Sequence, residues 1–235
     1  FFTVEPAEQI RYRGEKAHTG NMIFEGENPP AGAIFDYWSG ANDTPVTFDL
    51  FDGSGAQVAS LEAVASRGVN RTVWDLRHTW VDGTEGGGRG PLVVPGTYTA
   101  RMTQGGVTSQ RSVEVREDPR LEHDPSVRAQ WTETLLELWR LAADAEALAE
   151  TVDGVLERLD AVDAPLQVAR ALELQIRDMA RETAELDSRT GGLYGSATGW
   201  VGPLSADQAS QEEFLSGMLR TLEAEWSAVE VRLPR

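Results

Sequence analysis

The chain has 235 residues, among them 38 acidic and 21 basic side chains and no cysteine, so its formal net charge is −17. This charge disfavours binding to nucleic acid or to an anionic membrane face, and the absence of cysteine excludes disulfides and thiolate metal sites. Because the sequence contains no long apolar run, it also predicts no insertion into a membrane.

An extended N-terminal arm is predicted for residues 1–32. Pro29 and Pro30 lack backbone N–H groups and push the preceding residue towards extended geometry, so a helix is disfavoured here. We expect at most a short strand at Met22–Phe24, and we expect the arm to lie along a neighbouring protein. The aromatic contacts predicted for this arm are Phe1, Phe2 and Phe24.

Residues 33–118 alternate between short strand-like runs and turns. Trp74 and Leu76 face one way and the residues beside them face the other, as in a half-buried strand. Asp52–Gly55 and Gly105–Gly106 separate alternating runs and are typical of hairpins. The predicted strands are Ala33–Trp38, Pro45–Phe51, Gln57–Leu61, Asn70–Arg77, Thr97–Thr103 and Val107–Val115, with a loop at residues 82–92. The spacing predicts an immunoglobulin-like antiparallel β-sandwich of about six or seven strands.

Residues 119–235 predict a helical domain. Asp124 followed by Pro125 indicates a helix start, and apolar residues then recur every three or four positions to about Val162. A second helix carries an apolar face over residues 168–186 and is expected to end before a loop at Gly191–Pro203.

A capping box at Ser205 and Gln208 predicts the start of a third helix. Its expected apolar stripe is Phe214, Met218, Leu222, Trp226 and Val229. The fold class is therefore α+β, all-β and then all-α. The helical part is either a three-helix bundle or a long helical hairpin with a third helix laid on it.

Four motifs carry a resemblance to a known family. They are N-P-P-A-G-A at 28–33, V-N-R-T-V-W-D-L-R at 69–77, G-P-L-V-V-P-G-T-Y at 90–98 and D-P-R at 118–120. This combination resembles the C-terminal tail of exported bacterial proteins with a sortilin-like (BNR-repeat, "glycosyl hydrolase-like") β-propeller. In that family an Ig-like domain similar to the flagellar hook-cap type follows the propeller, and a helical segment comes next.

The resemblance implies a tail module without its propeller, since the N-terminal arm at residues 1–32 is too short to form two propeller blades. We therefore expect no residue of this chain to carry the hydrolase activity that is assigned to the propeller. The family is exported, and this chain begins with Phe1 instead of Met, so we expect a periplasmic or extracellular protein whose signal peptide has been removed.

The sequence offers no constellation that we expect to catalyse a reaction or to hold a metal ion or a cofactor. His18, His78 and His123 are scattered and have no second ligand at a suitable spacing. The glycine run at 86–90 lacks the Lys-Ser/Thr ending of a phosphate-binding loop, and no helix is expected to follow it.

Acidic residues also receive structural interpretations. Asp49 and Asp52 do not match the spacing of an EF-hand, so we assign them to a hairpin turn. The adjacent acids Glu117-Asp118 and Glu212-Glu213 are expected to be solvated surface.

Seven tryptophans are the most suggestive side chains. Trp74 is expected in the β core, and Trp131, Trp139 and Trp226 are expected at helix interfaces. Aromatic anchors near strand ends and loops often mark interfaces. With the three phenylalanines of the arm, the predicted partner-binding residues are Trp38, Trp80, Tyr194 and Trp200, the last in a docking loop at Gly199–Pro203.

The sequence thus predicts a non-enzymatic, exported structural module that binds protein partners and braces a larger assembly. An extrinsic subunit of a membrane complex is one version, and a photosynthetic reaction-centre–antenna complex is an example of such a host. Two alternatives stay open. One is an accessory tail of a propeller hydrolase or peptidase-like enzyme. The other is a carbohydrate-binding sandwich with Tyr37, Trp38 and Trp80 as a stacking platform.

Overall fold

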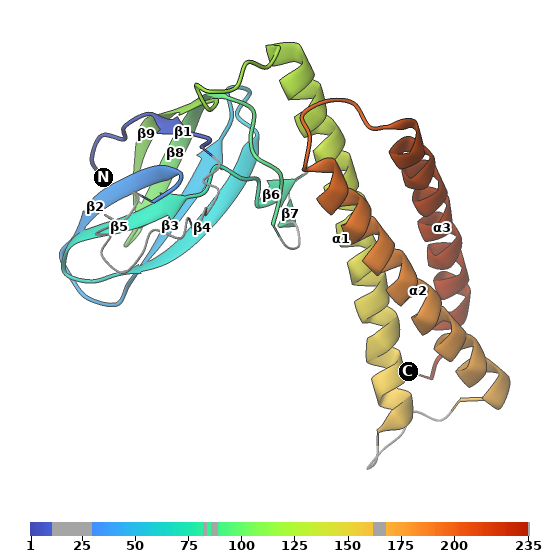
Figure 1. The fold of residues 1–235 in the computed structure, drawn as a ribbon. Helices are drawn as coiled ribbons and strands as arrows, with labels where there is room; N and C mark the ends of the chain where they lie inside the picture. The colour runs from blue at the N-terminus through green and yellow to red at the C-terminus, as the bar shows by residue number, and fades with distance from the viewer. Residues whose placement is uncertain (11–29, 82–83, 86–88, 162–167, 235) are drawn as a thin grey trace, which may run out of the picture. The chain divides into compact units, whose positions relative to one another are not determined.

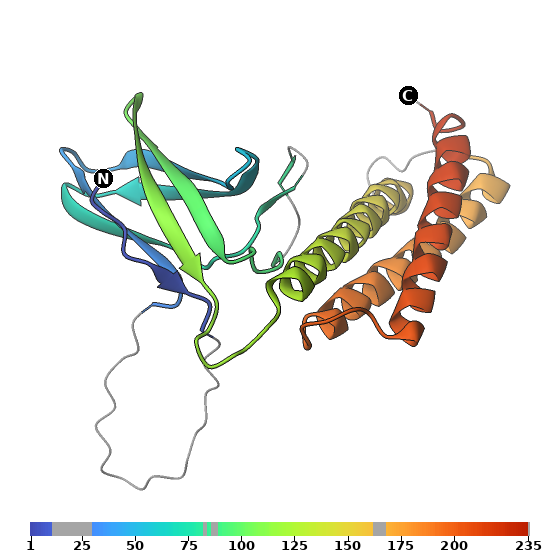
Figure 2. The ribbon, with the colours of Figure 1, turned by 90° about the horizontal axis from the view of Figure 1, so that it is seen from above.

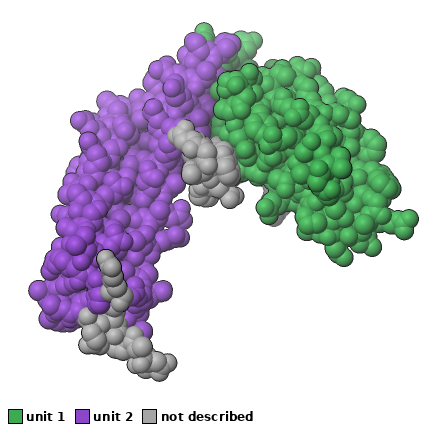
Figure 3. All heavy atoms as spheres, turned by 180° about the vertical axis from the view of Figure 1, so that it is seen from behind, with its two compact units in different colours: residues 1–85, 92–124 green, residues 86–91, 125–235 purple. Residues whose placement is uncertain are grey.

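The computed structural model describes residues 1–10, 30–81, 84–85, 89–161 and 168–234. These residues fall into two compact units, shown in different colours in Figure 3. The β unit comprises residues 1–85 and 92–124, and the helical unit comprises residues 86–91 and 125–235. The order of strands followed by helices is as predicted, although the β unit extends to Asp124 and residues 89–91 of the predicted 82–92 loop belong to the helical unit.

The β unit contains a five-stranded sheet, a two-stranded sheet and a short β-ribbon (Figures 1 and 2). The five-stranded sheet has the order β1-β9-β8-β3-β4, and all its pairs are antiparallel except β1 with β9. Its strands are β1 (Ala7–Glu8), β9 (Val107–Arg116), β8 (Gly96–Gln104), β3 (Thr44–Phe51) and β4 (Gln57–Ala65). The other strands are β2 (Ala33–Ser39) paired with β5 (Gly68–Trp74), and β6 (Trp80–Val81) paired with β7 (Thr84–Glu85).

One hydrophobic core is shared by both main sheets. Strand β2 alternates between buried and more exposed residues, so Phe35 and Tyr37 point inwards. The ring of Phe48 from β3 stacks on Phe35 at 5.2 Å and meets the edge of Tyr37 at 5.2 Å. Trp74 from β5 is fully buried against Tyr98 from β8, as expected for a core tryptophan. These contacts join the two sheets through large aromatic side chains.

Both predicted hairpin turns are confirmed. Gly105 and Gly106 connect β8 and β9 with φ values of 56° and 78°, which is the left-handed geometry that glycine adopts without a steric penalty. In the other turn the Asp52 carboxylate accepts hydrogen bonds from the backbone N–H groups of Ser54 and Ala56. Burial acts to raise the pKa of Asp52, but these bonds and one from the Ser54 hydroxyl lower it overall.

The strand predicted at Asn70–Arg77 ends earlier than expected. Strand β5 ends at Trp74, which pairs with Ala33 at the first residue of β2, so the ladder stops there. Leu76 takes a positive φ of 62° and its carbonyl accepts a hydrogen bond from Val93. Its side chain is nevertheless buried, as the alternation predicted. The inward orientation was right and the strand boundary was wrong.

The described part of the predicted arm belongs to the β unit. Ala7 pairs with Val115 of β9, and the backbone N–H of Phe2 donates to the carbonyl of Asp36 in β2. The Phe1 ring packs edge-on against Phe35 at 5.7 Å and also contacts Phe48. Residues 1–10 are thus part of this domain and not a separate arm, whereas the strand predicted at Met22–Phe24 lies outside the described residues.

The helical unit consists of α1 (Pro125–Asp160), α2 (Arg170–Ala197) and α3 (Ala206–Glu230). Its buried residues form one cluster drawn from all three helices, and α3 packs mainly against α2 and less against α1. The Ser205 hydroxyl accepts from the Gln208 backbone at 3.2 Å, and the Gln208 side chain accepts from the Ser205 backbone at 3.0 Å. The predicted capping box is confirmed. None of the described helices is long and apolar enough to span a membrane.

Two predictions about the helices were wrong. Helix α2 continues through the expected loop at Gly191–Gly195 to Ala197, because Leu193 and Ala197 extend its buried face and outweigh the low helix propensity of glycine. In α3 the buried stripe includes Leu215 and Leu219, one position after the expected Phe214 and Met218. The expected Leu222, Trp226 and Val229 are buried as predicted.

Candidate interaction surfaces

The outer face of the β2–β5 sheet presents an exposed apolar pair at one end. Trp38 is 58% exposed and lies directly opposite Val69, which is 70% exposed. Both side chains point outwards, because successive side chains of a strand point to opposite faces and the residues beside them are less exposed. Directly opposed aromatic and β-branched residues are a stabilising cross-strand pair, but here the pair also remains open to solvent.

An ion pair lies next to Trp38 and Val69 on the same face. Arg71 donates to both carboxylate oxygens of Asp36, at 2.7 and 2.8 Å. The hydrogen bond from Arg71 lowers the pKa of Asp36, while burial has a smaller opposite effect. This two-point contact holds the two strands together across the ladder, although the pair is too exposed to contribute much stability.

Among the strands that the structure describes, only β2 pairs with β5, so no described strand lies along the other edge of β5. Since the carbonyl of Asp36 faces Phe2, away from β5, Asp36 and Arg71 form a non-hydrogen-bonded pair of the antiparallel ladder. By the same alternation, the backbone N–H and C=O groups of Val69, Arg71 and Val73 point to the free edge. No hydrogen bond from any described residue reaches these groups. The exposed apolar pair therefore lies beside an open strand edge.

The loop between α2 and α3 presents a second exposed aromatic residue. Trp200 is 79% exposed, and its indole lies over Gly202, where a Cβ atom would come within 3.0 Å of Nε1. The indole N–H of Trp131 donates to the carbonyl of Ala197 at 3.1 Å and fixes the point where the loop leaves α2. Glycine at 202 allows Trp200 to fold across the loop while most of its surface faces solvent.

The other predicted contact residues lie in different settings. Phe2 is about half exposed, whereas Phe1 packs on the core of its own domain. Tyr194 lies on α2, not in a loop, and its hydroxyl donates to the carbonyl of Arg89 within the helical unit at 2.8 Å. Phe24 and the side chain of Trp80 lie outside the described residues.

The predicted carbohydrate platform is not formed as expected. Tyr37 is only 1% exposed, and the strand alternation places it on the face opposite to Trp38. A sugar ring cannot stack on a side chain that fills the core. The three aromatic residues named for that platform are therefore not a common surface.

A groove between α2 and α3 was missed by the sequence analysis. It has a volume of about 450 Å³, and its lining residues are Glu182, Glu213, Phe214, Gly217, Met218, Thr221 and Leu222. Phe214 is 56% exposed, and the guanidinium of Arg189 lies 5.0 Å from its ring centre. The expected stripe of α3 placed Phe214 in the core, whereas the buried residues are Leu215 and Leu219, one position further along the helix.

Asp118 corrects another prediction, since it is buried and not solvated. The carboxylate follows β9, is 2% exposed, and accepts hydrogen bonds from the backbone N–H and the guanidinium of Arg120. The hydrogen bond from the Arg120 side chain is the main reason that the pKa of Asp118 falls to about 2. This geometry fits a structural turn that ends the strand.

Replacing Asp118 with asparagine is expected to lower the melting temperature at neutral pH. The pKa of Asp118 is 3.8 when unperturbed and about 2 in the fold, so its stabilisation is present above pH 3.8 and is lost as the pH falls towards 2. Thermal unfolding at pH 7 and at pH 2 would show a difference between Asp118→Asn and wild type that disappears at the lower pH. Glu114→Gln, which removes the exposed pair with Arg116, is the control with little effect.

Within the described ranges, no three histidine or acidic side chains come together as a metal site. Both described histidines, His78 and His123, are partly buried, and His18 lies outside the described residues. Comparison with known proteins finds no matching family model and no similar protein among those with curated functions.

Proposed function

We propose that this chain is a non-enzymatic structural and interaction module that is exported and holds together a larger protein assembly. The observation that carries the proposal is the exposed Trp38–Val69 pair beside the unpaired edge of β5. The sequence motifs that resemble propeller-protein tails support the same function. In this proposal an Ig-like β-sandwich and a helical bundle are the two binding domains, and the aromatic core shared by both sheets supports the sandwich.

An open strand edge is suited to bind another protein. Its backbone groups are hydrated when free, and an added strand replaces that water with a ladder of hydrogen bonds. Outward-facing side chains of the added strand would lie against Val69 and Val73 and pair across from Arg71. Trp38 adds a large apolar surface of the kind that dominates protein interfaces.

Purification of the chain from its native host in mild detergent, followed by native mass spectrometry, tests the proposal. We expect a stable complex with at least one other protein. Val73→Pro should reduce recovery of the partner by about tenfold, because proline removes an outward N–H that the ladder with β2 does not use. The double variant Trp38→Ser, Val69→Ser should have a similar effect.

A matched control is available on the same domain. Val107 begins β9, is 71% exposed and lies on neither strand of the two-stranded sheet. Val107→Ser makes the same change as Val69→Ser at a similarly exposed valine and should leave partner recovery unchanged. Recovery of the wild-type chain only as a free monomer, or equal loss in all three variants, would contradict the proposal.

The accessory tail of a propeller enzyme remains the alternative function. It rests on the sequence resemblance alone, whereas the interaction module also has an exposed surface to support it. A reading frame with propeller repeats directly upstream would favour the tail.

A further inference from the structure

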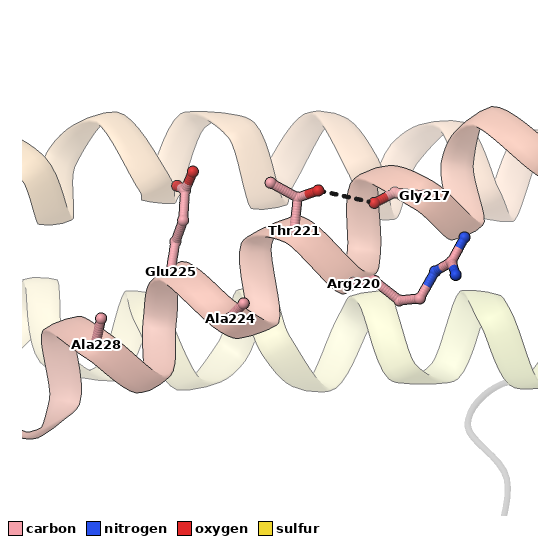
Figure 4. A pocket seen from close by; sticks show the side chains of 6 residues that line it. All are labelled: Gly217, Arg220, Thr221, Ala224, Glu225 and Ala228. Carbon is pink, nitrogen blue, oxygen red and sulfur yellow. Dashed lines mark hydrogen bonds between the residues drawn. The ribbon is translucent and has the colours of Figure 1, made fainter.

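The outward face of α3 carries a continuous strip of small residues. Gly217, Thr221, Ala224 and Ala228 follow one another at steps of three and four, opposite the buried stripe that begins at Leu215. They line a shallow, open depression with a volume of about 690 Å³. Arg220 and Glu225 also line this depression and extend to opposite sides in Figure 4. This surface continues into the groove between α2 and α3, because Gly217 and Thr221 line both.

The floor of this groove is apolar. Phe214 is more than half exposed, Met218 is partly buried and Leu222 is buried beneath them. A Cβ atom at Gly217 would meet no atom within 4 Å, so packing inside this chain does not require a glycine here. The Thr221 hydroxyl is already satisfied, because it donates to the carbonyl of Gly217 at 3.0 Å. The surface thus offers close approach without unsatisfied side-chain groups at its centre.

The rim of the surface is mostly acidic, with three glutamates and one arginine, Arg220. Glu182 from α2 and Glu213 from α3 flank the groove, and Glu225 flanks its continuation. Arg220 is the only basic residue of α3, and Arg189 on α2 is engaged with Phe214 and Glu185. The whole chain carries a net charge of −17. A second copy of this surface would bring like charges together, whereas a cationic partner would be attracted over long range.

We propose that this surface, which we call the α3 groove, binds a basic amphipathic helix of another protein. Helices pack closely where one presents small residues, and the strip from Phe214 to Ala228 is about 21 Å long at 1.5 Å per residue, enough for about four turns. Apolar side chains of the bound helix occupy the groove at Phe214 and Met218, and its lysines or arginines face the three glutamates. The inference deepens the proposed function by naming a partner class for the helical unit.

The test uses the full chain and a fluorescent model peptide of about 18 residues, with leucine on one helical face and lysine on the others. Fluorescence anisotropy should show saturable binding that weakens in high salt. Gly217→Leu fills the groove and should weaken binding by about tenfold or more. Gly154→Leu on the exposed face of α1, where a Cβ atom also meets nothing within 4 Å, should leave binding unchanged.

Charge is tested separately. The double variant Glu182→Gln, Glu213→Gln should weaken binding and reduce its salt dependence, while Glu146→Gln, Glu150→Gln on α1 should not. A peptide with glutamate in place of lysine should not bind. Circular dichroism and thermal unfolding confirm that each variant is folded.

The inference is overturned if the lysine peptide does not bind, if both leucine variants bind equally, or if the free chain is a dimer covered at Gly217. In these cases partner recovery that still depends on Val73 and Trp38 leaves the proposed function intact. If no native partner is recovered with the chain, both the proposed function and this inference are contradicted.

Discussion

Replacing Trp74 with alanine is expected to lower the free energy of unfolding of the β unit by about 3 to 5 kcal/mol. Trp74 is fully buried, packs edge-on against Tyr98, and donates its indole N–H to the carbonyl of Arg77. Alanine leaves a large cavity between the two sheets and removes the donor that fixes the chain after β5. That loss is a large fraction of the roughly 5 to 15 kcal/mol by which folded domains are typically stable.

The measurement must separate the two units. Hydrogen exchange followed by mass spectrometry, at increasing denaturant, reports on peptides from β3 and β8 apart from those of α1 and α2. We expect faster exchange in the β strands and little change in the helices. Trp200→Ala removes the same side chain from an exposed position and should change stability by less than about 0.5 kcal/mol. Similar effects of the two variants would mean that Trp74 is not a core residue.

Replacing Leu215 with alanine is expected to destabilise the helical unit by about 2 to 5 kcal/mol. Leu215 is completely buried in the cluster that joins the three helices, whereas the adjacent Phe214 is mostly exposed. Phe214→Ala deletes more atoms but should cost less than about 1 kcal/mol, because most of its surface is already in water. The larger side chain should therefore have the smaller effect.

This pair of variants tests which face of α3 is buried against the other two helices. Denaturant unfolding followed by circular dichroism at 222 nm reports mainly on the helices. If Phe214→Ala is the more destabilising change, the stripe predicted from the sequence is correct and the α3 groove loses its floor. The prediction is thus linked to the proposed helix-binding surface without depending on any partner.

The two surfaces proposed for binding use different chemistry. The β2–β5 surface offers backbone hydrogen bonds along a strand edge next to Trp38, so the partner proposed for it is an extended segment of another protein. The α3 groove offers small residues and a mostly acidic rim, so the partner proposed for it is a basic helix. One chain with both surfaces could link two partners, which is what a bracing subunit requires.

Several features of the candidate site were visible in the sequence. The sequence places Trp38 at a strand end and Trp200 in a loop, and both side chains are exposed in the fold. Tyr194 lies in a segment that the sequence predicts as a loop, but this segment is the last turn of α2, where the Tyr194 hydroxyl donates a hydrogen bond within the helical unit. The difference arises because a run of glycines suggests a loop, whereas burial of Leu193 and Ala197 keeps the helix continuous.

The helical periodicity of the sequence does not predict the α3 groove. Phe214 and Met218 fit a helical stripe as well as Leu215 and Leu219 do, because both sets recur every four residues. Periodicity alone cannot choose between overlapping stripes of this kind. The choice depends on which residues meet α1 and α2, and this is a property of the packed unit.

The sequence by itself determined the order of elements in this protein. The alternation of apolar and polar residues predicted the strands, and apolar residues at steps of three and four predicted the helices. The residue types at Gly105-Gly106 and at Ser205 and Gln208 predicted the hairpin turn and the capping box. These depend on neighbouring residues, so they can be found without tertiary contacts. Tertiary structure alone decided where β5 and α2 end, which strand edge is open, and which face of α3 is buried. Each of those outcomes depends on residues far apart in the chain, such as Phe2 with Asp36, whose contact no local pattern encodes.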